Sequence, residues 1–543
     1  MLRICYIKTA VFLFSFAMLL AVYSRADAVE FKVGGEWIVG FAVGDGSLIR
    51  KEEGHNVTAN DDTFGARQRF RLQLDAVANE VLSGTLFFEI GDQTWGRNAD
   101  DDGVGDQGGA LGADGTRAIK LKNAYIDWIA PLSKQDLRIR MGIQALTLPN
   151  AAGGSAILDT DVAAISASYL FNENIALTVA WMRPLNDNFA GWTLGGNPQR
   201  HSTNYLDNMD LLVLSLPITF EGIRLTPWVM YGILGKYALN CIDGEDHYQR
   251  VYGNRDYSQP EWKTNAGELS STLTNYLDEL NDNGLNDAKL SETNKPYFSM
   301  FWVGLPVVID IWDPLRIEFD INYGYVESIG RYDVLKRGQL RQRADSRRQG
   351  WLAKALVEYK FDWGIPGIFG WYASGDDGDM KNGSERIPSI AGAASFTSFS
   401  GYGGLDWGAK NGMVEWQADY SGTWGVGLQL RDLSFLEDLK HTIRVAWWGG
   451  TNSPSMVEYM ESRHAWNEGG IDNPYLTTHD SLLEINLDNK YKIYENFTVH
   501  LDLGYVFNMV DTDTWNRSWM EPETRDTQKQ DAWKAQVAFV YSF

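Results

Sequence analysis

Arginine recurs at alternate positions in two stretches of the chain. The stretch "FGARQRFRLQLDA" carries Arg67, Arg69 and Arg71, and "LRIRMGIQ" carries Arg138 and Arg140. A spacing of two places side chains on one face of a β-strand. Guanidinium groups stay charged at any physiological pH and tolerate close stacking, so such rows can set up a fixed electric field. The positions between them are mostly apolar, which predicts strands with one charged face and one apolar face.

Two acidic clusters, "NADDDGVGD" and "SGDDGDMKNG", offer carboxylates of the kind that Ca²⁺ prefers. Their spacing does not match an EF-hand, so solvated surface loops are the preferred interpretation and no cofactor is predicted. Calcium binding, or bridging to surface lipopolysaccharide through divalent cations, is the alternative. The candidate ligands are Asp100, Asp101, Asp102, Asp376, Asp377 and Asp379.

Enzymatic motifs are weak in this sequence. "GVGDQG" matches G-x-G-x-x-G, but an acidic loop surrounds it in place of a βαβ unit. The seven histidines are scattered, and no G-x-S-x-G or H-E-x-x-H occurs. His500 and Asp502 form the best base–acid pair, and a wall histidine is the simpler interpretation of His500. The prediction is that the protein is not an enzyme.

Many further segments alternate in the same way as the arginine stretches. "RIEFDINYGY" sets Ile317, Phe319 and Ile321 against Arg316, Glu318 and Asp320, and "LLEINLDN" and "TVHLDLGY" repeat the scheme. The chain ends on "WKAQVAFVYSF", whose alternate aromatic residues finish at Phe543. A soluble sheet with one wet face explains any one of these strands. A closed membrane barrel explains all of them together, because its outside is apolar and its inside polar.

The N-terminus has the layout of a secretory signal. Arg3 and Lys8 precede an apolar run over residues 10–22, which is too short to span a bilayer, and Ala26-Asp27-Ala28 fits a cleavage site. We therefore predict a signal peptide over residues 1–28 and a single domain over 29–543. The net charge of −23 argues against a nucleic-acid partner. Cys241 would be the only cysteine of the mature chain, so no internal disulfide is expected.

Connections between the predicted strands fall into two populations. Eight are tight, among them "VANEV", "FNENI" and "YENF", and the others are long and rich in Gly, Asp and Asn. Tight turns on the periplasmic side and long loops outside are typical of outer-membrane barrels. The count favours an all-β transmembrane antiparallel barrel of eighteen strands, with sixteen left open. An amphipathic helix is predicted in the loop around residues 265–284.

The C-terminal strand, the arginine rows and "IRMGIQ" resemble general bacterial porins. More specifically, "VEFKVGGEW", "LKNAYIDW" and "LRIRMGIQALTLPNAAGG" resemble the outer-membrane homotrimeric porins of sulfate-reducing bacteria. The resemblance covers the mature chain in layout and is most specific at its two ends and around residues 119–162. It implies a Gram-negative outer-membrane homotrimer, in contact with lipid and lipopolysaccharide, that lets small hydrophilic solutes and ions diffuse through a water-filled channel.

In porins the third outer loop folds into the barrel against an arginine-rich wall. By that resemblance "ALTLPNAAGGSAILDTDVAA" is the folded loop, with Asp159 and Asp161 pointing into the pore. Arg67, Arg69, Arg71, Arg138 and Arg140 would form the basic side of the constriction. Opposed rows of fixed charge orient polar solutes. A substrate-specific channel with saturable solute-binding sites is the alternative function, and a weak cation preference is the expectation for ions.

Overall fold

The structure is a computed structural model. It describes residues 29–45, 48, 52–53, 56–57, 63–95, 119–131, 137–186, 208–235, 295, 297–328, 331–337, 340–394, 396–397, 420–459, 475–517 and 529–543. The predicted signal peptide, Asp100, Asp101, Asp102 and the helix expected around 265–284 lie outside these residues. Among the described residues, no helix is long and apolar enough to cross a membrane.

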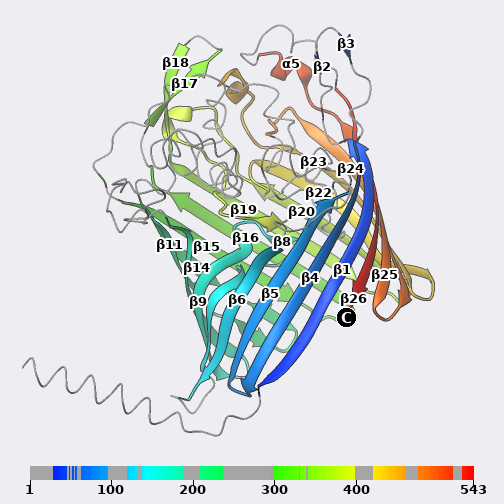
Figure 1. Cartoon of the computed structure of the whole chain (residues 1–543). Coiled ribbons are helices and arrows are strands. Elements are labelled where there is room, and N and C mark those ends of the chain that lie inside the picture. Colours follow the sequence, from blue (N-terminus) through cyan, green and yellow to red (C-terminus); the bar gives the residue numbers. More distant parts are fainter. Residues whose placement is uncertain are drawn as a thin grey trace, which may run out of the picture.

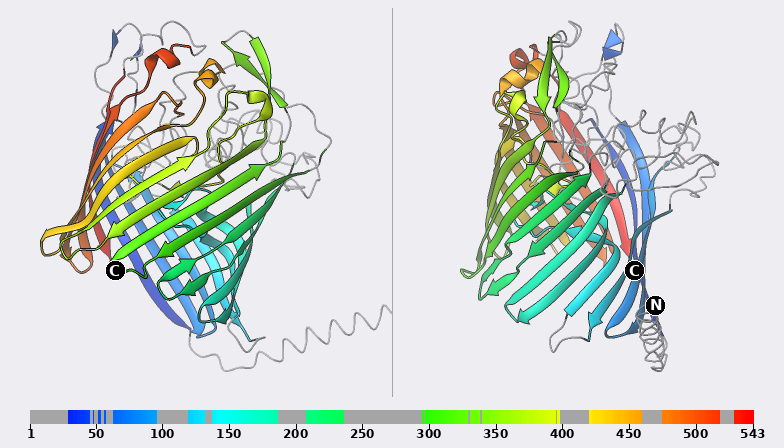
Figure 2. Two further views of the ribbon diagram at one scale, coloured as in Figure 1. Left: turned by 180° about the vertical axis from the view of Figure 1, so that it is seen from behind. Right: turned by 90° about the vertical axis from the view of Figure 1, so that its left-hand side faces the viewer.

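The described residues form a closed antiparallel barrel of eighteen strands. Figures 1 and 2 show the barrel from three sides. Each strand pairs with the next in sequence, and the last pairs with the first over Glu36↔Ser542 to Asp45↔Trp533. The strands are β1 Glu30–Asp45, β4 Thr63–Asn79, β5 Leu82–Thr94, β6 Ile119–Ala130, β7 Leu137–Thr147, β9 Asp159–Asn172, β10 Ile175–Asn186, β11 Asn208–Ser215 continued by β12 Ile218–Phe220, β13 Ile223–Leu225 continued by β14 Trp228–Gly235, β15 Tyr297–Ile309, β16 Leu315–Val326, β19 Arg348–Tyr359, β20 Ile365–Ala373, β22 Thr423–Leu436, β23 Leu439–Gly450, β24 Ser481–Tyr494, β25 Phe497–Asn508 and β26 Ala532–Ser542.

Proline explains the two interrupted strands. Pro217 separates β11 from β12 and Pro227 separates β13 from β14, and each lacks the N–H that a ladder needs. The ladder resumes on both sides, because Leu216 N donates to Pro227 O and Ala176 N donates to Pro217 O. Each interrupted pair therefore counts as one strand, which confirms eighteen rather than sixteen.

Small elements stand at the end of the barrel opposite the tight turns (Figure 1). They are the ribbons β2 Glu52–Glu53 with β3 Asn56–Val57 and β17 Arg331–Lys336 with β18 Leu340–Asp345, and the short helices η2 Met380–Asn382, η3 Pro454–Tyr459 and α5 Thr512–Trp515. Inside the barrel, β8 Gly154–Ser155 pairs with β21 Ala393–Ala394. The predicted division into tight turns at one end and long connections at the other is confirmed.

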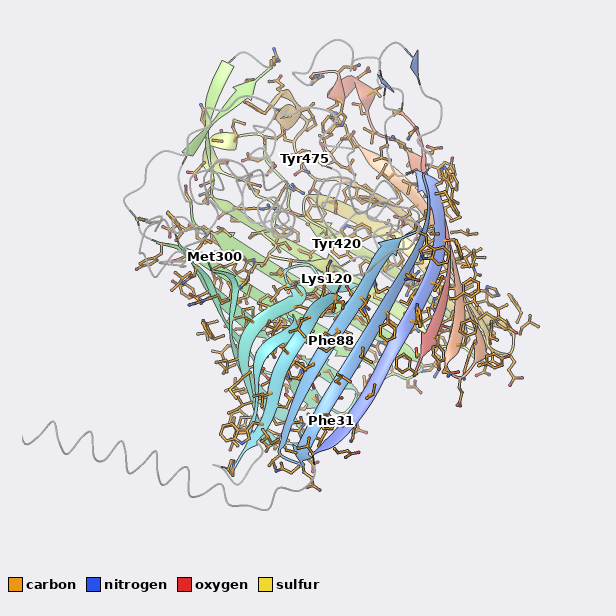
Figure 3. The ribbon with its side chains drawn as sticks, in the orientation of Figure 1. Phe31, Phe88, Lys120, Met300, Tyr420 and Tyr475 are labelled. Atoms are coloured by element: carbon orange, nitrogen blue, oxygen red, sulfur yellow. The ribbon has the colours of Figure 1, made fainter. Side chains whose placement is uncertain are left out.

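The two faces of the wall follow the alternation in the sequence. On β16, Phe319 and Ile321 are 40% and 41% exposed on the outside, whereas Asp320 is 1% exposed on the inside. Phe31, near the tight-turn end in Figure 3, belongs to the exposed apolar set, whereas Tyr475, near the loop end, is buried. Phe543 closes the last strand, because its N–H and C=O both bond to Gly35 and its ring stacks on Phe70.

One section of the wall departs from this scheme. On β10, β11, β14 and β15 the inward side chains are apolar as well, and they share one buried cluster with residues of two segments that fold into the barrel. The wall contributes Met182, Met209, Leu211, Met230, Met300 and Trp302, and the inner segments contribute Leu148, Ile157, Leu158, Ile387 and Ile390. Part of the barrel interior is therefore a packed core, and the charged inner faces lie on the remaining wall.

Candidate functional site

The inner loop, residues 148–158, leaves the wall as a continuation of β7 and β9. Pairing between β6 and β7 ends at Ala124↔Ile143, whereas β7 and β9 stay paired up to Thr147↔Asp159. The end of the β7–β9 hairpin is therefore no longer bonded to β6, while β7 and β9 remain bonded to each other. Asp159 and Asp161, which the sequence analysis placed in the loop, belong to strand β9 for this reason.

A second inner segment, residues 384–394, holds the inner loop from one side. Ile390 N and Ala391 N donate to Ile157 O, and Asp159 N donates to Ala391 O at 2.7 Å. The β8–β21 ribbon continues the same contact. Arg348, buried on β19, secures the second segment by donating to the carbonyls of Arg386 and Ile387. The two inner segments therefore form one unit.

Three charged residues of the facing wall, Glu318, Asp320 and Lys354, hold the tip of the inner loop, and we call them the clamp. Ala152 N donates to Glu318 Oε2 at 2.7 Å, and Ala151 N donates to Asp320 Oδ2 at 3.4 Å. Lys354 Nζ donates to Gly154 O and lies 3.2 Å from Asp320 Oδ2. The side chains of Lys354 and Asp320 are 0% and 1% exposed. Loop and wall thus share a buried charged contact.

The sequence of the tip suits this close approach. Ala152, Gly153 and Gly154 have φ values of 54°, 87° and 91°, in the left-handed region that glycine adopts at least cost. A Cβ on Gly153 would lie 2.7 Å from the hydroxyl of Tyr420, a side chain labelled in Figure 3. Glycine at 153 and 154 is therefore favoured by the backbone conformation, and at 153 also by space.

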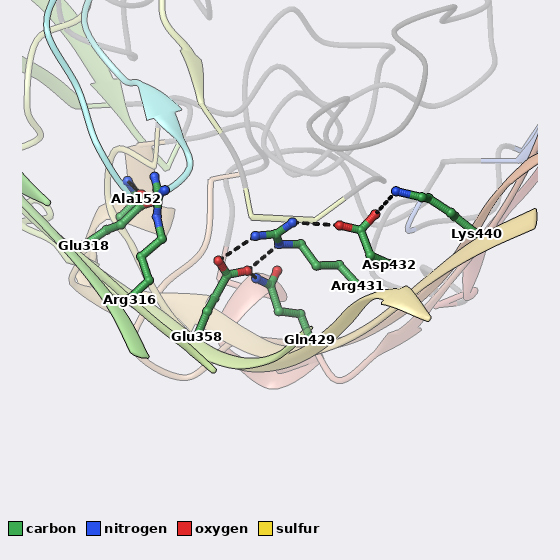
Figure 4. Close-up of polar contacts among 8 residues, drawn as sticks. All are labelled: Ala152, Arg316, Glu318, Glu358, Gln429, Arg431, Asp432 and Lys440. Atoms are coloured by element: carbon green, nitrogen blue, oxygen red, sulfur yellow. Dashed lines mark hydrogen bonds and ion pairs between the residues drawn. The ribbon is translucent and has the colours of Figure 1, made fainter. Parts of the chain in front are cut away.

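From the clamp, polar side chains continue along the inner wall towards the tight-turn end of β23, and we call them the charge row (Figure 4). Arg316 Nε donates to Glu318 at 2.7 Å. Arg431 grips Glu358 with Nε and Nη2 at 2.5 and 2.8 Å, and Gln429 donates to the same carboxylate at 2.8 Å. The row consists of Arg316, Glu318, Glu358, Gln429, Arg431, Asp432 and Lys440, so its three cations balance its three acids.

Strand register explains how the two parts of this row lie on neighbouring strands. Arg316 on β16 lies directly opposite Glu358 on β19. On the next strand, β20, Gly367 lies opposite Glu358 on one side and opposite Gln429 of β22 on the other. Gly367 has no side chain to intervene, and a Cβ there would be 3.1 Å from Glu358 Cγ and 3.2 Å from Gln429 Cγ. Glu358 can therefore reach across β20 to β22.

The predicted arginines of β4 lie in a second charged group, which we call the arginine cluster: Glu36, Arg69, Arg71, Glu89, Lys122 and Asp161. Arg71 binds Glu89 at 2.8 Å and Glu36 at 3.4 Å, and Arg69 Nε lies 4.0 Å from Glu89. Lys122 bridges Glu89 at 3.7 Å and Asp161 at 3.4 Å. Asp161 and the arginines are thus joined through side chains that the sequence analysis did not select.

The remaining predicted residues are not brought into that cluster by the described contacts. Arg140 forms a bidentate pair with Asp127 at 2.7 and 2.9 Å and stacks 4.1 Å from the Tyr125 ring centroid. Arg138 lies two residues earlier on β7. Asp159 accepts a hydrogen bond from Thr147 at 2.6 Å. Arg67 belongs to β4, and its side chain is outside the described part of the structure.

The loop aspartates Asp376, Asp377 and Asp379 are tied into local turns. Asp376 accepts from Ser384 and Tyr475, and Asp377 accepts from Asp379 N and Asn382. Within the described ranges, no group of three or more His, Cys, Asp or Glu side chains is placed to hold a metal ion. Burial, with the nearby charges of Asp376 and Asp377, raises the pKa of Glu385 to about 7.

The histidine and aspartate of β25 have separate partners. His500 Nε2 lies 3.3 Å from Thr498 Oγ1, whereas Asp502 accepts from Gln536 at 3.3 Å. These contacts are those of a polar wall and provide no support for a base–acid pair.

The clamp and the charge row were missed because the sequence analysis selected arginine repeats. Two signals were present. "LAKALVEY" places the charged Lys354 and Glu358 on one face of β19 together with Leu352 and Leu356, and "RIEFD" was read as a wall strand without a role. Likewise the apolar runs "MDLLVLSLP" and "WVMYGILG" show no alternation, which is typical of strands buried on both faces.

No family model and no curated protein matches the chain. Among solved structures, it is similar to Pseudomonas aeruginosa OccK11 (OpdR), with 11% identity, a TM-score of 0.44 and coverage of 94% of this chain and 96% of that chain. It is also similar to P. aeruginosa OpdO, with 12% identity, a TM-score of 0.46 and coverage of 95% and 97%, and to Acinetobacter baumannii OccAB2, with 11%, 0.46, and 94% and 98%. Likenesses of this size carry no argument about function. The barrel fold rests on the strand pairing itself.

Proposed function

We propose that the chain is an outer-membrane porin, a channel through which small hydrophilic solutes and ions diffuse passively. The observation that carries the proposal is a closed barrel with an apolar outside and a charged inner wall that faces an inward-folded loop. Only closed barrels and helices satisfy their backbone groups within a bilayer, and eighteen strands are enough to enclose an aqueous lumen. The outward apolar band, with exposed Trp37, Phe319 and Trp447 among others, is the surface that lipid covers.

In this proposal the constriction lies between the inner loop, the charge row and the arginine cluster. Of the predicted ring of Arg67, Arg69, Arg71, Arg138 and Arg140 against Asp159 and Asp161, the arginine cluster contributes Arg69, Arg71 and Asp161. The charge row supplies the rest. Each group pairs its cations with as many acids, so we expect weak ion selectivity rather than a strong preference for either sign.

Export and assembly complete the proposal. Residues 1–28 would be removed as a signal peptide, the barrel would form a homotrimer, and lipid and lipopolysaccharide would surround it in the outer membrane of a Gram-negative bacterium. Cross-linking of the membrane-inserted protein, followed by intact-mass measurement, tests the oligomer and the start at Val29 together. A monomer, or retention of residues 1–28, would contradict this part.

A substrate-specific channel is the second candidate, because the charge row presents ordered ionic groups to a solute. Liposome flux separates the two candidates. A general porin gives rates that rise linearly with the concentration of each of a set of neutral sugars and fall with their size. A specific channel gives a rate that saturates for one class of solute. Failure of every solute to cross would refute both.

A further inference from the structure

In the solvent-exposed part of the charge row, positive and negative side chains alternate: Arg431, Asp432 and Lys440. Arg431 Nη1 lies 3.0 Å from one oxygen of Asp432, and Lys440 Nζ lies 3.4 Å from the other. The side chains of Arg431, Asp432 and Lys440 are 36%, 39% and 60% exposed, whereas that of Glu358 is 4% exposed. A solute at this wall therefore meets a cation, an anion and a second cation within a few ångströms, and the buried Glu358 holds the first of them in place.

Over the part of the chain that the structure describes, Arg431 retains donors for a solute. Three of its five N–H groups are directed at Glu358 and Asp432 by the contacts above. Because Glu358 takes the Nε–Nη2 edge, the guanidinium plane is fixed rather than free to rotate. The remaining donors can meet an acidic group, while the partly exposed carboxylate of Asp432 can meet an ammonium group.

We infer that this segment of the charge row binds zwitterionic solutes, which carry one ammonium and one acidic group, in preference to solutes with a single charge. The inference rests on the proposed channel function and names its substrate class. A lone anion between Arg431 and Lys440 meets repulsion from Asp432. A lone cation at Asp432 meets repulsion from both neighbours. A zwitterion places its acidic group beside Arg431 or Lys440 and its ammonium group beside Asp432. Its preference over singly charged solutes therefore comes both from these attractions and from the repulsion that the other solutes meet.

Asp432 is the residue on which the preference depends, and the chain allows a clean substitution there. Asp432 has a φ of 56°, a left-handed conformation that asparagine also tolerates. Asp432→Asn therefore removes the negative charge and keeps the backbone. Asp310→Asn is the matched control: Asp310 is a similarly exposed aspartate, at 44%, paired with Arg224 and outside the clamp, the charge row and the arginine cluster.

The test measures flux of taurine, isethionate and choline into liposomes that contain the full-length mature protein. These solutes are similar in size and are respectively zwitterionic, anionic and cationic, and none crosses a bare bilayer readily. Taurine is expected to enter about fivefold faster than isethionate, which corresponds to about 1 kcal/mol, the upper range of one exposed ion pair. Asp432→Asn is expected to bring the ratio near one, and Asp310→Asn to leave it as in the wild type.

Each outcome decides the inference. Equal rates for the three solutes through the wild type would overturn it while the proposed channel function stands. An unchanged ratio in Asp432→Asn, or an equal loss in Asp310→Asn, would also overturn it, because the preference would then not arise at Asp432. Flux of none of them would overturn the inference and the channel together. A preference that Asp432→Asn alone removes would support it.

Discussion

Replacement of Lys354 by methionine is expected to loosen the constriction. The ammonium of Lys354 is fully buried, bonds to the tip of the inner loop at Gly154 O and neutralises Asp320. Breaking a buried pair by removing one partner costs about 3–5 kcal/mol, because the remaining charge is left without compensation. Strand β16, which carries Asp320, is paired with a neighbouring strand on both sides. The inner loop is therefore the part that can move away from the contact.

The magnitude indicates fluctuation rather than permanent opening. A change of 3–5 kcal/mol shifts an equilibrium by roughly 10²- to 5 × 10³-fold. The amides of Ala151 and Ala152 still bond to the two carboxylates, and the second inner segment still pairs with Ile157, so part of the attachment remains. Single-channel recordings of Lys354→Met should therefore show a larger mean conductance and strong open-channel noise.

Two further variants make this prediction decisive. Lys354→Arg keeps the cation and should retain quiet, wild-type conductance. Asp320→Asn combined with Lys354→Met removes both charges, which is nearly neutral compared with the removal of one, so the noise should largely disappear. Wild-type behaviour of Lys354→Met, or equal noise in the single and double variants, would refute the clamp as the element that positions the loop.

Three other predictions follow from single positions. Gly367→Val should separate Glu358 from Arg431 and change ion selectivity, measured by reversal potential, because the new Cβ would lie 3.1 Å from Glu358 Cγ. Selectivity equal to that of the wild type would contradict a role of the contact between Glu358 and Arg431. Glu385 has a pKa raised to about 7 from an ordinary value near 4.5, so its loop should be most stable below about pH 4.5 and should lose that stability as the pH rises through about 7. Hydrogen exchange at residues 376–386, corrected for intrinsic rates, should show more opening at pH 8 than at pH 6, and Glu385→Gln should abolish the difference. Deletion of Phe543 removes both backbone bonds to Gly35 and should reduce the yield of heat-modifiable folded barrel on gels. Unchanged yield would show that closure does not depend on the last residue.

The alternation in the sequence was sufficient to predict the wall. Period-two patterns place charged and apolar residues on opposite faces whatever the neighbouring strand is, so "RIEFDINYGY" and the terminal strand could be assigned correctly from the residues alone. Tight turns could be found for a similar reason, because Gly, Asn, Asp and Pro mark them locally.

The clamp could not be predicted, because it depends on which strand the inner loop reaches. Gly154 and Lys354 are 200 residues apart, and only closure of the barrel brings them into contact. Likewise, nothing local shows that Gly367 lets Glu358 reach Arg431 across a strand. Arginine repeats were easy to see, but the acid that neutralises an arginine can lie on another strand, as Glu89 does for Arg71.

Planar-bilayer conductance of the purified wild-type protein, with the reversal potential under a KCl gradient, tests the central claim most directly. Discrete ohmic steps and a reversal potential near zero are expected, since the charges at the constriction balance. Absence of conductance would contradict the open channel, and a strongly anion- or cation-selective current would contradict the balanced constriction.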